Sequence, residues 1–119
     1  MTELELAKAI AKVLDNKKAM DIKAIHITEY SIVADYFVIA TGTSNTHVKA
    51  LADEVEYEIE NQFSIKPDHI EGRATGWILL DYSSVLVHVF TGESREYYNL
   101  ERLWSDANQI DLSDVLTDD

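Results

Sequence analysis

One apolar run constrains the fold of this chain more than any other feature: Tyr36 to Thr41, followed at once by the turn Gly42-Thr43-Ser44. A nearly continuous apolar stretch of this length is typical of a central strand that is buried on both faces. After the turn, apolar residues recur every three or four positions, which predicts a helix over residues 44–62. A strand, a turn and a helix in this order predict an α/β fold in which a second strand lies parallel to the first.

The chain before this run predicts one helix and one strand. Thr2 and Glu5 have the spacing of a capping box, and apolar residues at helical intervals follow, so we expect a helix over residues 3–18. The segment from Ile22 to Thr28 is short and rich in β-branched residues, which indicates an edge-like strand.

The chain after the second helix predicts a hairpin and a third helix. Two β-rich runs, Trp77–Leu80 and Val85–Phe90, flank a short polar turn, and a helix capped by Ser94 is expected to continue through Trp104. The segment between Pro67 and Gly72 is expected to be irregular. The predicted domain is a single α/β unit, a small mixed sheet packed with helices in the order α-β-β-α-β-β-α.

This domain is expected to span residues 1–110, and an acidic tail, residues 111–119, is expected to be solvated and frayed. The net charge of −12 opposes binding to phosphate, which disfavours nucleic-acid and acidic-membrane partners. No apolar stretch is long enough to cross a bilayer, and the charged, helix-patterned start is unlike a secretory signal. The absence of cysteine excludes disulfides and thiolate metal sites and is compatible with a reducing compartment. We therefore expect a cytoplasmic protein.

The turn at Gly42 is similar to the start of a nucleotidyltransferase site, in which a Gly-Ser turn is followed by two metal-binding carboxylates. The nearby acidic residue Asp53 falls within the helix pattern, and the next strand offers only Asp81. Two carboxylates converging on one divalent ion are missing, and the four histidines show no metal-binding or catalytic spacing. The residues thus predict no catalytic site, no metal and no cofactor, and the turn is explained by helix capping.

Several aromatic residues have no complete structural explanation. Tyr97 and Tyr98 are adjacent on a predicted helix, so at least one of them must be partly exposed. Trp104 fits the core by its helical spacing, whereas Trp77 fits a core and a binding surface equally well. His88 alternates with valines on a strand, which indicates a half-buried histidine bonded to a neighbour. Exposed tryptophan and tyrosine are typical of binding hot spots.

Several motifs in one order resemble the ribosomal silencing factor family, also called RsfS or Iojap. They extend from about Asp21 to Ala107 and include Ala34–Gly42 with Ser44 and His47, Glu71-Gly72, Trp77–Tyr82, Val87–Phe90, Arg95 and Tyr98–Trp104.

The resemblance implies a fold similar to nucleotidyltransferases without their active site, and a translational repressor rather than an enzyme. It implies a partner, the large ribosomal subunit, bound through ribosomal protein uL14, so that docking of the small subunit is blocked when nutrients are scarce. A homodimer is a second implied partner. Carried over by position, the candidate residues for the uL14 surface are Arg73, Trp77, Leu79, Arg95, Glu96 and Tyr98.

Two alternatives remain open at this stage. One is an active nucleotidyltransferase that uses Gly42, Ser44, Asp53 and Asp81, which Mg²⁺-dependent nucleotide turnover would reveal. The other is an interaction module that homodimerises through a sheet edge or exposed aromatic residues and has a partner other than the ribosome.

Overall fold

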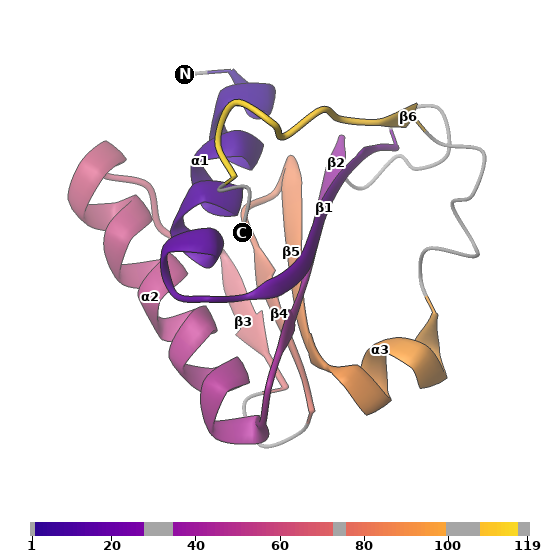
Figure 1. The fold of residues 1–119 in the computed structure, drawn as a ribbon. Helices are drawn as coiled ribbons and strands as arrows, with labels where there is room; N and C mark the ends of the chain where they lie inside the picture. Colours follow the sequence, from indigo (N-terminus) through magenta and orange to yellow (C-terminus); the bar gives the residue numbers. More distant parts are fainter. Residues whose placement is uncertain (1, 28–34, 73–75, 100–107, 117–119) are drawn as a thin grey trace.

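A six-stranded sheet forms the centre of the molecule (Figure 1). The structure, a computed structural model, describes residues 2–27, 35–72, 76–99 and 108–116. The strands are β1 Met20–His26, β2 Tyr36–Gly42, β3 His69–Glu71, β4 Trp77–Asp81, β5 Val85–Thr91 and β6 Asn108–Gln109, in the spatial order β3-β4-β5-β2-β1-β6. The helices are α1 Glu3–Asn16, α2 Asn45–Phe63 and α3 Gly92–Tyr98. The predicted single α/β domain with a mixed sheet is confirmed.

The predicted parallel pair lies in the middle of the sheet and consists of β2 and β5. Tyr36 lies opposite Val85 at one end of the pair, and Gly42 lies opposite Thr91 at the other. The hairpin of β4 and β5 is antiparallel, as expected, and β1 is antiparallel to β2. Because β2 has a neighbour on each side and is apolar along its length, it forms the buried centre of the domain.

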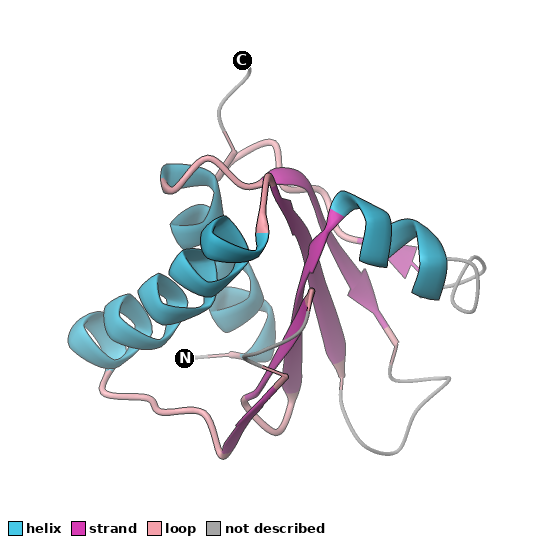
Figure 2. Cartoon of the chain, turned by 90° about the horizontal axis from the view of Figure 1, so that it is seen from below, coloured by secondary structure: helices cyan, strands magenta, loops and turns pink. Residues whose placement is uncertain are grey.

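Helices α1 and α2 cover one face of the sheet (Figure 2). Alternate strand residues such as Val38 of β2 and Val87 of β5 point to this face, where they pack with Leu14 of α1 and Leu51 of α2 in the main core. None of the helices within the described residues combines the length and the apolar character that a bilayer-spanning helix needs.

The turn from β2 into α2 depends on glycine and on a cap. The Ser44 Oγ accepts a hydrogen bond from the backbone N–H of His47 at 3.1 Å, so Ser44 is the predicted N-cap. A Cβ at Gly42 would lie 2.9 Å from Val48 Cγ2 and 3.0 Å from the Val48 nitrogen. The strand can therefore pass this close to the first turn of the helix only without a side chain at this position.

The third helix differs from its prediction at both ends. Its N-cap is Thr91, whose Oγ1 accepts from the Ser94 N–H at 3.2 Å, so the helix begins three residues earlier than expected. It ends at Tyr98 because Asn99 adopts the left-handed conformation, with φ 44°, in which the helix cannot continue. Trp104, expected on the same helix, lies outside the described residues.

The sheet is wider than predicted because a short strand is added at each edge. Strand β3 lies within the segment that was expected to be irregular, and pairs with β4 through Ile70 opposite Leu80. Strand β6 pairs with β1 through Gln109 opposite Ile25, so the prediction of β1 as an edge strand is wrong. Strands of two or three residues carry too little alternation to be found from sequence.

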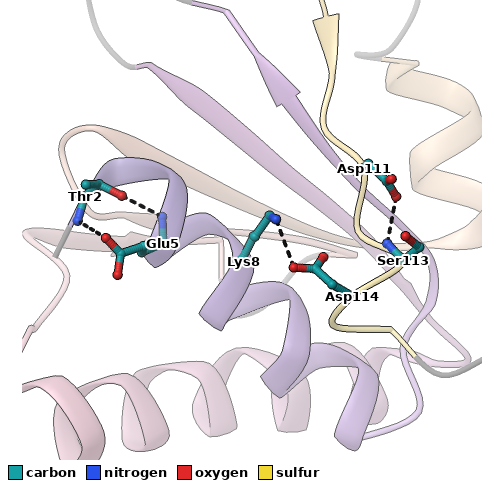
Figure 3. Close-up of polar contacts among 6 residues, drawn as sticks. All are labelled: Thr2, Glu5, Lys8, Asp111, Ser113 and Asp114. Atoms are coloured by element: carbon teal, nitrogen blue, oxygen red, sulfur yellow. Dashed lines mark hydrogen bonds and ion pairs between the residues drawn. The ribbon is translucent and has the colours of Figure 1, made fainter.

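The described part of the acidic tail packs against the domain, whereas we had expected the tail to be solvated and frayed. Leu112 is buried in the main core. The Ile110 N–H donates to the Ala24 carbonyl at 2.8 Å, and Lys8 Nζ forms an ion pair with Asp114 at 3.0 Å (Figure 3). Burial of the apolar residues among the aspartates thus holds the segment up to residue 116 against α1 and β1.

Replacing Gly42 with alanine is expected to destabilise the fold by about 1–3 kcal/mol, because the new Cβ would collide with Val48. Gly92→Ala is the matched control, since a Cβ there meets no atom within 4 Å. Urea denaturation followed by circular dichroism measures both variants. Equal unfolding free energies for the two variants would contradict the proposed close approach of β2 and α2.

Candidate functional site

The face of the sheet opposite α1 and α2 carries a second apolar cluster, on the side where α3 lies (Figure 2). Strand residues of the opposite parity to the main core point to this face. Its buried members are Ile25, Ile27, Phe37, Ile39 and Phe90, and the partly buried Trp77 and Leu86 pack against them. The cluster is rich in aromatic rings, which are the side chains that contribute most to binding surfaces.

Trp77 and Tyr98 form the outer layer of this cluster. The ring centroid of Trp77 lies 5.1 Å from that of Phe90 in a stacked arrangement and 4.6 Å from that of Tyr98. Trp77 is half-buried, whereas Tyr98 is 47% exposed and Tyr97 is 81% exposed. Both tyrosines are thus accessible. The ring of Tyr98 contacts Trp77, and the ring of Tyr97 packs edge-on against Tyr98.

A pocket of about 320 Å³ opens beside the two aromatic rings. Its lining residues are Glu71, Gly72, Trp77, Leu79 and Tyr98. The position of Leu79 follows from strand pairing, because it lies between Glu71 of β3 and His88 of β5 and has the same parity as Trp77. Strands β3 and β4 and helix α3 therefore build one concave surface with two aromatic rings and, among the described residues, one carboxylate in its lining.

His88 lies beneath Trp77 and is hydrogen-bonded to it, so the predicted bond to a neighbour is present, but the side chain is buried and not half-buried as expected. The Trp77 Nε1–H donates to His88 Nδ1 at 3.1 Å. Because an indole nitrogen can only donate, His88 Nδ1 must carry a lone pair, and the single ring proton of the neutral imidazole resides on Nε2. His88 Nε2 is buried and has no hydrogen-bond partner among the residues that the structure describes.

Burial controls the charge of His88. The side chain is 5% exposed, and desolvation lowers the pKa of the imidazole from 6.5 to about 4. The ring is therefore neutral at neutral pH and stays an acceptor for the indole of Trp77. Although its spacing on the strand was recognised, its bond to Trp77 could not be found from sequence, because it depends on the side-chain orientation of a residue on the neighbouring strand.

The remaining sequence-predicted residues are placed differently. Arg95 is an internal tether: its Nη1 donates to the Asp21 carbonyl at 2.6 Å and to Thr41 Oγ1 at 2.8 Å, which joins α3 to the ends of β1 and β2. Glu96 is exposed on α3 but does not line the pocket. Arg73 lies outside the described residues. The structure thus brings together Trp77, Leu79 and Tyr98.

The parts of a nucleotidyltransferase site are not assembled. Gly42 lies opposite Thr91 at one end of the central strands, whereas Asp81 lies opposite Leu86 at the other end, roughly 16 Å away at the rise of a β-strand. Asp81 Oδ1 instead accepts from the backbone N–H of Ser83 at 2.7 Å. Within the described ranges, no group of three or more metal-binding side chains is present.

The buried imidazole predicts a specific dependence of stability on pH. Between pH 6.5 and about 4, the unfolded chain binds a proton at His88 that the folded chain does not, so the free energy of unfolding falls as pH falls through this window. The loss from this residue is at most about 3 kcal/mol. Urea denaturation of the natural protein and of His88→Phe between pH 7 and pH 4 isolates it, because the variant lacks this titration. Parallel pH curves would refute the neutral, buried state of His88.

Comparison with known proteins shows which family the chain resembles. A family described as "Ribosomal silencing factor during starvation" matches residues 1–119. The ribosomal silencing factor RsfS of Bacillus subtilis is 41% identical over 114 residues, which cover 94% of this chain and 95% of that protein. The same-named protein of Halalkalibacterium halodurans is 36% identical over 118 residues, or 98% of this chain and 100% of that one.

A solved structure supports the fold independently. The crystal structure of a protein from Chromobacterium violaceum matches with a TM-score of 0.84 at 31% sequence identity, and the match covers 88% of each chain. Since the family match spans the whole sequence and the relatives are similar over nearly their full lengths, this chain belongs to the ribosomal silencing factor family.

Proposed function

We propose that this protein is a translational repressor that binds the large ribosomal subunit through ribosomal protein uL14 and thereby blocks association with the small subunit under nutrient limitation. The family supports the coarser statement, a ribosome-associated regulator of translation rather than an enzyme. The observation that carries the finer proposal is the pocket formed by Trp77, Leu79 and Tyr98 on the sheet face opposite α1 and α2.

The surface has the physical character of a protein-binding site. Trp77 presents one side of its indole beside the half-exposed Tyr98, and Phe90 supports the indole from below. A partner side chain that enters the pocket would remove these apolar rings from water, which is the common composition of a hot spot. The rings sit on paired strands and on a tethered helix, so little conformational entropy would be lost on binding.

Charge supports a protein partner over bare RNA. The chain has a net charge of −12, which repels phosphate and attracts basic proteins, and ribosomal proteins are typically basic. Helix α2 carries Asp53, Glu54, Glu56, Glu58 and Glu60 and lies on the opposite side of the sheet from the pocket (Figure 2). When the pocket faces the large subunit, this acidic helix would point outward, where it would repel the RNA of an approaching small subunit as well as obstruct it.

The proposal places the protein in the cytoplasm, where it would meet ribosomes. Homodimerisation is part of the same proposal: a dimer that used the pocket would compete with the ribosome, whereas a dimer that used another surface would leave the pocket free. Sedimentation of the free protein over a range of concentrations, with and without the Trp77→Ala substitution, distinguishes these arrangements.

Truncation of either residue of the aromatic pair, Trp77 or Tyr98, is expected to weaken binding to the large ribosomal subunit. Trp77→Ala and Tyr98→Ala are each expected to weaken co-sedimentation with purified large subunits by about 30-fold, which corresponds to about 2 kcal/mol for a hot-spot anchor. Tyr57→Ala is the matched control, because Tyr57 is 63% exposed but lies on α2. Circular dichroism verifies that the variants fold.

If folded Trp77→Ala and Tyr98→Ala bind as tightly as Tyr57→Ala, the pocket is not the ribosome-binding surface. If the unaltered protein remains at the top of a sucrose gradient while large subunits sediment, the ribosomal partner itself is excluded.

A further inference from the structure

We propose that His88 is a positioning residue: its Nδ1 fixes the orientation of the Trp77 indole and so sets the shape of the pocket through which the partner is bound. The inference rests on the proposed function for its consequence, but the orientation of Trp77 can be tested without the ribosome. His88 itself is buried behind the pocket and is absent from its lining.

The hydrogen bond selects one orientation of the indole. Rotation of the Trp77 ring about its bond to Cβ would turn Nε1–H away from His88 and towards solvent, where water could accept the bond instead. The same rotation would break the stacking on Phe90 and the contact with Tyr98, whose centroids lie 5.1 and 4.6 Å from that of Trp77. An acceptor beneath the ring removes the advantage of turning towards water.

His88 can act as a fixed acceptor because its own ring is held. It lies on β5 between β4 and β2, and its centroid is 4.7 Å from that of Phe37 in an edge-on arrangement and 6.1 Å from that of Phe90 in a stacked one. A ring enclosed in this way has little freedom to follow a moving partner. The orientation of Trp77 is therefore set from the interior of the sheet.

The energetics also argue for a role beyond packing. Leaving His88 Nε2–H buried without a partner among the described residues is destabilising, and an apolar side chain at this position would avoid that cost. Within the described residues, the His88 imidazole forms its hydrogen bond with Trp77, through Nδ1. A histidine at this apolar position costs stability. Its presence is explained by its hydrogen bond to Trp77, which fixes the orientation of the indole.

The test compares two substitutions of nearly the same shape. His88→Asn keeps an acceptor at the δ1 position, whereas His88→Leu replaces it with a methyl group. In ¹⁵N-labelled protein carrying Trp104→Phe, Trp77 gives the single indole resonance. We expect His88→Leu to shift this resonance and to speed exchange of the indole proton with water by about 3- to 10-fold, which corresponds to the loss of one hydrogen bond. His88→Asn is expected to restore both.

Binding to large subunits supplies the functional readout. His88→Leu is expected to weaken binding by a similar factor, about 3- to 10-fold, while His88→Asn recovers most of the affinity. Trp77→Phe removes the donor, so adding His88→Leu to it should cause no further loss.

The indole measurements and the ribosome-binding measurements test the positioning role of His88 and the proposed function separately. An indole resonance and an exchange rate that are the same with leucine and asparagine at position 88 would overturn the positioning role, whatever the ribosome shows. A shifted indole with unchanged ribosome binding would show that the orientation does not govern recognition and would also overturn it. If no form of the protein binds the ribosome, the proposed function fails while the indole measurements still decide whether His88 orients Trp77. If His88→Asn does not fold, the double-variant comparison with Trp77→Phe decides.

Discussion

The parallel pairing of β2 and β5 is the constraint on which the rest of the structure depends. It places two apolar strands side by side and fixes the parity of every residue on them, with Val38 and Val87 facing α1 and α2 and Phe37 and His88 facing the other side. A shift of one residue would exchange the two faces and bury the wrong set. The close approach at Gly42 then directs the chain into α2, so that the main core and the aromatic surface are formed on opposite sides of one sheet.

The strongly patterned elements could be predicted from sequence, and the weakly patterned ones could not. The capping box at Thr2 and Glu5 and the N-cap at Ser44 are local signals, and both form as expected. Strands β3 and β6 are too short to show alternation. The left-handed conformation of Asn99, which ends α3, could not be predicted because the apolar spacing continues beyond this residue. The tail was expected to be solvated because its acidic residues are evident from the sequence. The packing of Leu112 could not be predicted, because it depends on contacts with elements distant in the sequence.

The candidate site shows the same division. Trp77 and Tyr98 could be singled out because burial alone did not explain two adjacent tyrosines and a tryptophan at the start of a strand. Their contact, at 4.6 Å between centroids, and the bond from Trp77 to His88 are tertiary features that join β4, β5 and α3. Arg95 was expected to face a partner, but its hydrogen bonds to the Asp21 carbonyl and to Thr41 show it tying α3 to the sheet. A charged residue near a binding surface can therefore contribute by holding the surface in place.

The proposed function combines two sides of the molecule that differ in chemistry: an aromatic pocket for a basic protein partner and an acidic helix that faces away from it. The most direct measurement is site-specific photo-crosslinking on purified large subunits, with p-benzoylphenylalanine placed at Leu79 in the pocket or at Tyr57 on α2. The account predicts a crosslink to ribosomal protein uL14 from position 79 and none from position 57. A crosslink to uL14 from position 57 alone, or from position 79 to other ribosomal components only, would contradict it.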